Sequence, residues 1–390
     1  MAVQDHRAPL RSSFGAASEA YPTAGEHTPP KAVIESHVRF IPVPVGLAGP
    51  LRISASGIPE DEYYAPLATV EPTLVASCSR GCKALTESNG LRFKILREGM
   101  ARAPVFTFHD PEDALASVGL IPAIQDQLTR DARSTSRFAH LQALRSHVID
   151  TRVHLAFDYI NGEAAGQDVV TVTTQAACDL FLASIAAKKL RIRDFAIEGD
   201  MASDKKASRR DAANACRVQV IAWGELTNDV CERVLECTTE RLHQELMTVT
   251  QARTRNGGFG CTVDAANVMA AMFTACGQDA ASVMESSWMH LTPEYDAYSK
   301  DLKLSLFCPD LPVDAIGEST ISPPQKASLE LLKCRGPGSK SKVAGLVASF
   351  CLALDVGTAA ATASGNFTHA HRWLARDEDD KSRLQLTEGI

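Results

Sequence analysis

The sequence predicts an α+β protein of two domains, with the smaller domain inserted into the larger one. Three features predict it: short segments of alternating polarity between residues 103 and 197, long helices of small residues after residue 204, and a similar helix near residue 72. Because helical regions flank the short segments on both sides, we expect one helical domain, residues 31–102 and 198–372, interrupted by an insertion.

The insertion, residues 103–197, has a regular order of predicted elements. They are a strand at 105–108, a helix at 113–128, strands at 141–149 and 152–159, a helix at 164–189 and a strand at 194–197. In the third strand, Val153, Leu155, Phe157 and Tyr159 alternate with polar or small residues and share one face. The order βαββαβ is that of a ferredoxin-like domain.

Before the insertion, the chain changes from irregular to helical. Residues 1–30 are rich in Pro, Ala, Ser and Gly without periodicity, which predicts a flexible arm. The two prolines at the start of residues 41–51 exclude a helix there. Pro72 suits the first position of a helix, so Glu71 is expected at the N-cap or just outside it.

The helix that follows Pro72 has one polar and one apolar face. Thr73, Ser77 and Arg80 recur at i, i+4 and i+7 on the polar face. Small residues, with Ser77 and Gly81 among them, keep the helix thin, so another helix or a ligand can approach closely. By spacing alone, a buried amphipathic helix with a capping glutamate is the simpler interpretation.

After the insertion the sequence returns to helices rich in Ala, Gly, Ser and Cys. They are predicted at residues 207–216, 226–250, 265–284, 325–334 and 341–363, with one or two strands between them. Such small residues favour close helix packing. Residues 373–390 are mostly charged and are expected to form a solvated tail.

Composition limits the possible partners. The 390 residues are 45% hydrophobic with a net charge of −7, which indicates a globular chain and argues against nucleic acid as a general partner. Neither a run of membrane-spanning length nor a signal peptide is present, so we expect a cytoplasmic protein with no membrane partner. The 11 cysteines are scattered and odd in number, which predicts reduced core residues. No zinc-type spacing, phosphate-binding loop or dinucleotide-binding glycine motif occurs, so we expect no metal site and no Rossmann domain.

Two charged features call for a functional explanation. Lys205 and Lys206 stand together at a predicted helix start. Two cations there lower each other's pKa, while a nearby carboxylate has the opposite effect, and the pair is unfavourable without an anion to bind. Asp279 interrupts a nearly apolar helix, where a carboxylate needs a partner. A solvated lysine pair and an exposed aspartate on a polar stripe are the alternatives. A lone histidine near the C-terminus, His369, is usually unremarkable.

Several motifs in order resemble 3-hydroxy-3-methylglutaryl-coenzyme A (HMG-CoA) reductases, most closely the eukaryote-type branch. They are residues 41–51 (Ile-Pro-Val-Pro-Val-Gly-Leu-Ala-Gly-Pro-Leu), Glu71, 74–77 (Leu-Val-Ala-Ser), 80–83 (Arg-Gly-Cys-Lys), 134–138 (Ser-Thr-Ser-Arg-Phe), 204–206 (Asp-Lys-Lys) and 275–281 (Ala-Cys-Gly-Gln-Asp-Ala-Ala). The similarity is collinear from about residue 33 to residue 372. Several motifs in order make it far more specific than any one motif alone.

This resemblance implies an activity: two hydride transfers from NADPH, or alternatively NADH, convert HMG-CoA into mevalonate and free CoA. It also implies a large domain that holds the acyl-CoA, a ferredoxin-like domain that holds the cofactor, and a homodimer or homotetramer with active sites at the subunit interface.

The resemblance also assigns roles to residues. Glu71 corresponds to the catalytic proton donor, with a pKa raised by burial, Lys205 to the lysine that stabilises the oxyanion, Asp279 to the aspartate that bridges the two, and His369 to the histidine that protonates the CoA thiolate. The implied substrate-binding residues are Ser77, Arg80, Lys83, Arg102, Asp204 and Lys206. The implied cofactor-binding residues are Gly162, Glu163, Ala164, Ala165, Gly166, Gln167 and Asp168.

The sequence departs from the family pattern mainly by gaining acid and losing glycine. Glu198 and Asp200 replace a serine and an asparagine, Asp168 stands where an amide is usual, and Gly317-Glu318-Ser319-Thr320 replaces a glycine-rich motif. Weaker binding of anionic ligands is the physical expectation. Three hypotheses follow: a divergent HMG-CoA reductase, a reductase of a different acyl-CoA thioester, and a non-catalytic paralogue that binds acyl-CoA or a true reductase.

Overall fold

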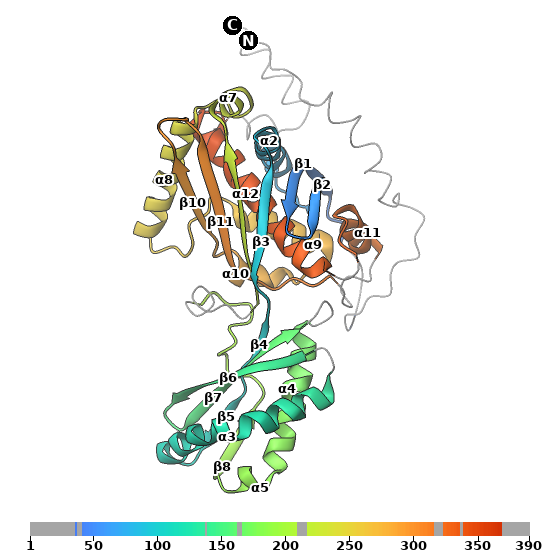
Figure 1. Ribbon diagram of the computed structural model, residues 1–390, viewed down its shortest axis with the longest axis vertical. Coiled ribbons are helices and arrows are strands. Elements are labelled where there is room, and N and C mark those ends of the chain that lie inside the picture. Colours follow the sequence, from blue (N-terminus) through green and yellow to red (C-terminus); the bar gives the residue numbers. More distant parts are fainter. Residues whose placement is uncertain are drawn as a thin grey trace.

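The computed structural model describes Ser36 and residues 41–136, 139–161, 166–208, 217–315, 323–335 and 338–368. These residues form two units, each built on its own β-sheet and joined where β3 (Leu91–Arg97) leads into β4 (Met100–Arg102) (Figure 1). The fold is α+β, as predicted. The predicted arm (1–30) and tail (373–390), and most of the helix predicted at 207–216, lie outside the described residues.

The smaller unit has the element order that the sequence predicts. Its elements are β4 (Met100–Arg102), β5 (Val105–Phe108), α3 (Pro111–Thr135), β6 (Ala139–Ile149), β7 (Arg152–Asn161), α4 (Gln167–Ala183), α5 (Ile185–Lys188) and β8 (Ile192–Ala196). The strands pair antiparallel in the order β6-β7-β5-β8. The short strand β4 also pairs with β7, beyond the part of β7 that pairs with β5. Phe106, Phe157 and Phe181 lie in the apolar core between the sheet and its helices.

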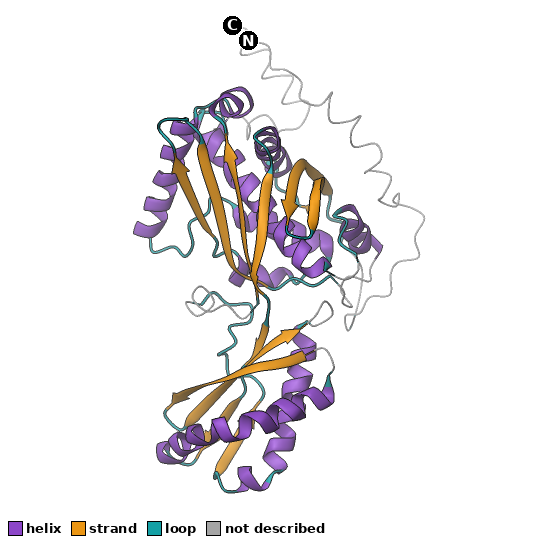
Figure 2. Ribbon diagram, in the orientation of Figure 1, coloured by secondary structure: helices purple, strands orange, loops and turns teal. Residues whose placement is uncertain are grey.

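The larger unit contains more strand than the sequence predicts. Its described part holds a six-stranded sheet in the order β10-β11-β9-β3-β1-β2 (Figure 2). The strands are β1 (Val45–Ala55), β2 (Ile58–Ala68), β3 (Leu91–Arg97), β9 (Val218–Leu226), β10 (His290–Tyr295) and β11 (Leu302–Leu311). The sequence prediction did not include β3, although its buried residues Leu91 and Phe93 alternate with the exposed Arg92 and Lys94, which is the pattern of a half-buried strand.

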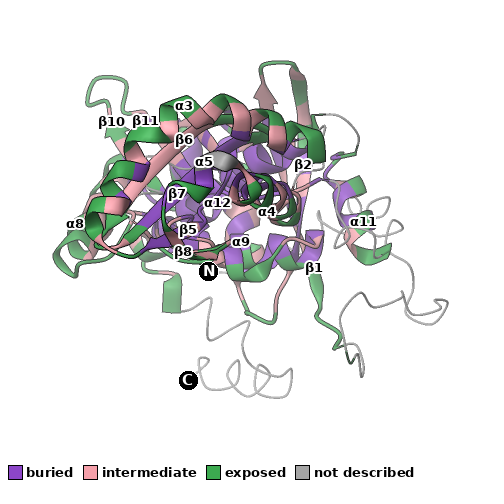
Figure 3. Ribbon diagram, turned by 90° about the horizontal axis from the view of Figure 1, so that it is seen from below, coloured by how far each residue is buried: buried purple, intermediate pink, exposed green. Residues whose placement is uncertain are grey.

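The helices of the larger unit pack against this sheet. They are α2 (Leu74–Glu87), α7 (Asn228–Val230), the π-helix η1 (Cys231–Leu235), α8 (Thr239–Arg255), α9 (Ala265–Cys276), the 3₁₀ helix η2 (Ala280–Ser282), α10 (Val283–Ser286), α11 (Pro323–Leu331) and α12 (Ser339–Ala363). Helix α12 packs on α2, α9 and the central strands, and almost all of its residues are buried (Figure 3). It is long and apolar enough to cross a membrane, but in this fold it is the central helix of the core.

Helix α2 begins two residues later than predicted. It starts at Leu74, and its N-cap residue, Thr73, has a left-handed backbone (φ +79°) without a side-chain capping bond. A β-branched residue is strained in that conformation. Pro72 is therefore not the first helical residue, and Glu71 lies just outside the helix, two residues before its N-cap.

Candidate functional site

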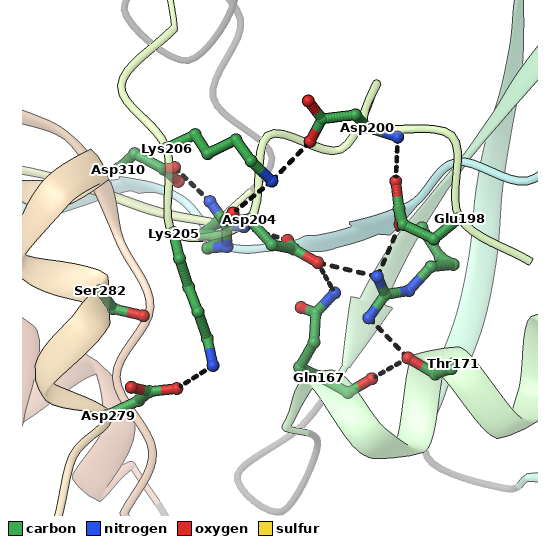
Figure 4. A network of polar contacts seen from close by, with 12 residues as sticks. Gln167, Thr171, Glu198, Asp200, Asp204, Lys205, Lys206, Asp279, Ser282 and Asp310 are labelled. Atoms are coloured by element: carbon green, nitrogen blue, oxygen red, sulfur yellow. Dashed lines mark hydrogen bonds and ion pairs between the residues drawn. The ribbon is translucent and has the colours of Figure 1, made fainter.

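Arg102, at the end of β4, is the centre of a polar network between the two units. Its guanidinium donates hydrogen bonds to Glu198 (2.6 Å), Asp204 (2.8 Å) and Thr171 of α4 (2.6 Å) (Figure 4). The Arg102 side chain is only 9% exposed. This arginine, implied by the resemblance as a substrate-binding residue, is therefore already paired with two carboxylates of its own chain.

Asp204 joins this arginine to a second one. Arg217 donates hydrogen bonds to Asp204 and to Asp310 (2.5 Å), and Gln167 donates another to Asp204 (2.5 Å). Burial acts to lower the pKa of Arg217, but Asp310 and Asp204 outweigh it and raise that pKa. The network thus holds two guanidinium groups and three carboxylates, and it ties the start of α4 to the larger unit.

Lys205 and Lys206 each have a carboxylate partner of their own. Lys205 forms an ion pair with Asp279 (2.7 Å), and Lys206 forms one with Asp200 (2.6 Å). The hydrogen bonds to these carboxylates raise the pKa of both lysines. The predicted opposing effect of a nearby carboxylate therefore outweighs the repulsion between the two lysines, with Asp279 coming from a distant segment and Asp200 from the same loop.

Asp279 follows α9 rather than interrupting a helix. Gly277, with a left-handed backbone (φ +69°), ends α9, and the Asp279 side chain accepts a hydrogen bond from the N–H of Ala281 at the start of η2 (3.0 Å). Partial burial acts to raise the pKa of Asp279, but the bonds from Lys205 and Ala281 lower it. A carboxylate that stays ionised and an ammonium that stays protonated therefore meet at this point.

Glu71 lies near the other end of α9. Its two carboxylate oxygens accept hydrogen bonds from the side-chain amide of Asn267 (2.9 and 3.0 Å), in the first turn of that helix. From Asn267 to Cys276, the last residue of α9, the helix rises about 14 Å. One chain therefore holds Glu71 well apart from the Lys205–Asp279 pair. The expected burial of Glu71 is also not found, because its side chain is exposed.

The predicted substrate-binding residues of α2 have different surroundings. Arg80 donates a hydrogen bond to the backbone oxygen of Gly357 in α12 (2.9 Å), and burial lowers its pKa. Ser77 is half-buried, whereas Lys83 is exposed. Of these three predicted substrate-binding residues, Arg80 is the one whose side chain forms a hydrogen bond with α12.

The described part of the predicted cofactor segment begins at Gly166. Gly166 is the N-cap of α4 and makes no side-chain capping bond, so the first N–H groups of this 17-residue helix suit a phosphate. Asp168 in the first turn acts against an anion there. The N–H groups at the start of α4 are therefore suited to a dinucleotide phosphate, whereas the negative charge of Asp168 is not. Gly162, Glu163, Ala164, Ala165 and His369, and residues 317–320, lie outside the described residues.

Three site residues were given no role from the sequence. Arg217 and Asp310 are buried ion-pair partners, and Asn267 holds the Glu71 carboxylate. Each has a weak signal: Arg217 and Asp310 are charges within or beside apolar strands, and Asn267 follows two alanines at a helix start. A charge in an apolar strand needs a partner, but the sequence does not indicate which one.

Comparisons with known proteins agree on one family. The family model described as hydroxymethylglutaryl-coenzyme A reductase matches residues 2–376. A 3-hydroxy-3-methylglutaryl-coenzyme A reductase from Haloferax volcanii is 32% identical over 384 residues, 96% of this chain and 93% of the relative. One from Aeropyrum pernix is 32% identical over 351 residues, 88% of this chain and 82% of the relative.

A solved structure has a similar fold. It is the class II 3-hydroxy-3-methylglutaryl-CoA reductase from Streptococcus pneumoniae bound to NADPH, with a TM-score of 0.65. The match covers 84% of this chain and 87% of that one at 18% identity.

Proposed function

Because this chain belongs to the hydroxymethylglutaryl-coenzyme A reductase family, we propose that it reduces HMG-CoA to mevalonate and CoA with NADPH. The observation that carries the proposal is the Lys205–Asp279 ion pair, at 2.7 Å, beside the network around Asp204. A non-catalytic paralogue has no need to keep a reactive lysine and its aspartate in contact.

Lys205 supplies the electrostatic part of the reaction. Its raised pKa keeps the ammonium charged, so it stabilises the negative charge that develops on the thioester oxygen when hydride arrives. Asp279 orients that ammonium and keeps it protonated. NADPH, when bound, supplies the hydride for each of the two reduction steps. In this proposal His369 protonates the departing CoA thiolate.

The active site is built from two copies of the chain. Glu71 is exposed and held by Asn267 near the start of α9, whereas Lys205 and Asp279 meet beyond its end. A second subunit placed against this face brings its own Lys205 and Asp279 to Glu71 and buries the carboxylate. Burial raises the pKa of a carboxyl group, which is what a proton donor requires. A homodimer, or a tetramer of such dimers, follows.

The cofactor binds to the smaller unit. The backbone N–H groups of Gly166, Gln167 and Asp168, with Gly162, Glu163, Ala164 and Ala165 before them, would hold the dinucleotide phosphates at the start of α4, against the charge of the Asp168 side chain. Gln167 also donates a hydrogen bond to Asp204 (2.5 Å), so the cofactor segment is connected to the substrate network. This connection supports hydride transfer between a cofactor on the smaller unit and an acyl group on the larger one. We place the protein in the cytoplasm.

Turnover by the purified full-length chain tests the proposal. With HMG-CoA, it should oxidise two molecules of NADPH for each mevalonate formed, which absorbance and mass spectrometry measure together. Replacing Lys205 by alanine should reduce kcat by about 100-fold or more, because an oxyanion-stabilising group is lost. The matched control, Lys303→Ala, changes an exposed lysine of β11 and should keep full activity. No turnover with either NADPH or NADH would refute the proposal.

One observation favours a second candidate, the reduction of a different acyl-CoA thioester. Glu198 and Asp204 both pair with Arg102, so this buried guanidinium is less available to a carboxylate on the acyl group. An acyl group without a distal carboxylate suits such a network better. Competition between HMG-CoA and CoA thioesters whose acyl group is uncharged decides between the candidates. A higher kcat/KM for a thioester with an uncharged acyl group favours the second candidate.

A further inference from the structure

Two cysteine side chains of the larger unit lie against each other, apart from the polar network. The Sγ atoms of Cys231 and Cys237 are 4.0 Å apart. Cys231 is the first residue of η1, and Glu236, which follows η1, has a left-handed backbone (φ +59°). This turn returns the chain and places the second thiol beside the first. A disulfide needs about 2 Å between the sulfur atoms, so a small side-chain movement closes the pair.

The surroundings of Cys237 favour its reactive form. Cys237 is 8% exposed, and Arg80 and Arg241 lie close enough to act on its charge. The hydrogen bond from Cys231, together with these two cations, lowers the pKa of Cys237 and outweighs burial and Glu236, which act to raise it. By contrast, burial raises the pKa of Cys261, although that residue is more exposed. Cys237 therefore has both an activated thiol and a second cysteine within reach.

We propose that Cys231 and Cys237 form a redox-sensitive pair, which a peroxide converts into a disulfide. The Cys237 thiolate attacks the O–O bond of hydrogen peroxide, forming an S–O bond and releasing hydroxide, so the sulfur becomes a sulfenic acid. The Cys231 sulfur then attacks the Cys237 sulfur, forming the S–S bond. The S–O bond breaks, and the oxygen leaves as water with the proton of Cys231. The two thiols lose two electrons, and the peroxide is reduced to water.

The disulfide would act on a contact with the segment that follows α12. Glu236, between the two cysteines, accepts a hydrogen bond from the side chain of Asn366 (2.6 Å), three residues before His369. Closing the S–S bond constrains this turn and weakens the Glu236–Asn366 contact. Turnover is therefore expected to fall several-fold on oxidation. This consequence depends on the proposed function, whereas the formation of the disulfide does not.

Mass spectrometry of the full-length chain tests the disulfide directly. The reduced protein is treated with hydrogen peroxide, quenched, alkylated and digested. We expect Cys231 and Cys237 to be linked, with the loss of two hydrogens, and to resist alkylation. A dithiol should reverse both changes. In Cys231→Ser, Cys237 should instead be trapped as a sulfenic acid that dimedone labels. The control Cys178→Ser, which changes a buried thiol of the smaller unit, should behave as the unchanged chain does.

Other outcomes would overturn the proposal. Oxidation of Cys261 while Cys231 and Cys237 both remain thiols would refute the redox-sensitive pair, whatever the activity. A disulfide that leaves turnover unchanged would refute its effect on the active site. If peroxide lowered the turnover of Cys231→Ser as much as that of the unchanged chain, the effect of the disulfide on the active site would also be refuted. Loss of all activity before oxidation would contradict the proposed function instead, and the mass measurement would still report on the pair.

Discussion

A single buried carboxylate links the core of the larger unit to the Glu71 site. Asp355 is fully buried in α12 and accepts a hydrogen bond from the backbone N–H of Asp264, the N-cap residue of α9 (2.8 Å). Burial raises its pKa to about 7, even though backbone N–H groups of Asp264 and Val263 act to lower it. Asp355 thus fixes the start of the helix whose Asn267 holds Glu71.

This carboxyl group should make stability depend on pH. Its pKa is raised on folding, so its contribution is fully present below about pH 4 and is lost as the pH rises to about 7. Across that range the loss is about 4 kcal/mol. Asp355→Asn keeps an acceptor for the Asp264 N–H but cannot ionise. Urea unfolding of both proteins at several pH values should show the steeper decline in the unchanged chain, and parallel pH profiles would refute the assignment.

At the level of elements, two glycines let α2 and α12 pack closely. A Cβ atom on Gly81 would lie 1.8 Å from the backbone oxygen of Ala353, and one on Gly357 would lie 2.1 Å from that of Ser77. The sequence predicted that α2 is thin enough for another helix to approach, and α12 is that helix. This contact also positions the Gly357 carbonyl that accepts the hydrogen bond from Arg80.

Adding one methyl group at this crossing should separate the helices. Gly357→Ala should lower the free energy of unfolding by about 1–3 kcal/mol, because the backbone of α2 must move. Gly119→Ala is the matched control, since Gly119 is exposed in α3 with no atom within 4 Å of an added Cβ. That change should be stabilising by about 0.5–1 kcal/mol. Denaturant unfolding measures both, and equal effects would contradict the close packing.

At the level of the whole molecule, the positions of the catalytic candidates predict how subunits share a site. Lys205 and Asp279 pair within one chain, whereas Glu71 lies near the other end of α9. In the proposed dimer each active site therefore takes Glu71 from one subunit and the lysine–aspartate pair from the other.

Mixing inactive variants tests this arrangement. Glu71→Ala and Lys205→Ala, unfolded and refolded together, should regain up to about a quarter of the unchanged activity, because half of the dimers are mixed and each has one intact site. A mixture of Lys205→Ala and Asp279→Ala should stay inactive, since both residues come from the same chain. Kinetic assays after refolding measure the recovery. No recovery in the first mixture, with dimers present, would place all three residues in one chain's site.

The sequence by itself determined the features that depend on neighbours along the chain. Alternating residues such as Val153, Leu155 and Phe157 predicted the smaller unit's strands, because the period of a strand is local. The ordered motifs also identified Lys205 and Asp279, which lie 2.7 Å apart in the structure. The same period of two is present in β3, where the prediction overlooked it. Local patterns failed before α2, where backbone geometry decides the start of the helix.

Only the tertiary structure decided which charges meet. Arg102 pairs with Glu198 and Asp204, and Arg217 pairs with Asp310, across separations of up to 102 residues. Such pairings depend on how two sheets and their helices pack, and no periodicity in the chain encodes them. For the same reason the sequence grouped Glu71 with Lys205 and Asp279, whereas the length of α9 keeps Glu71 apart from them within one chain.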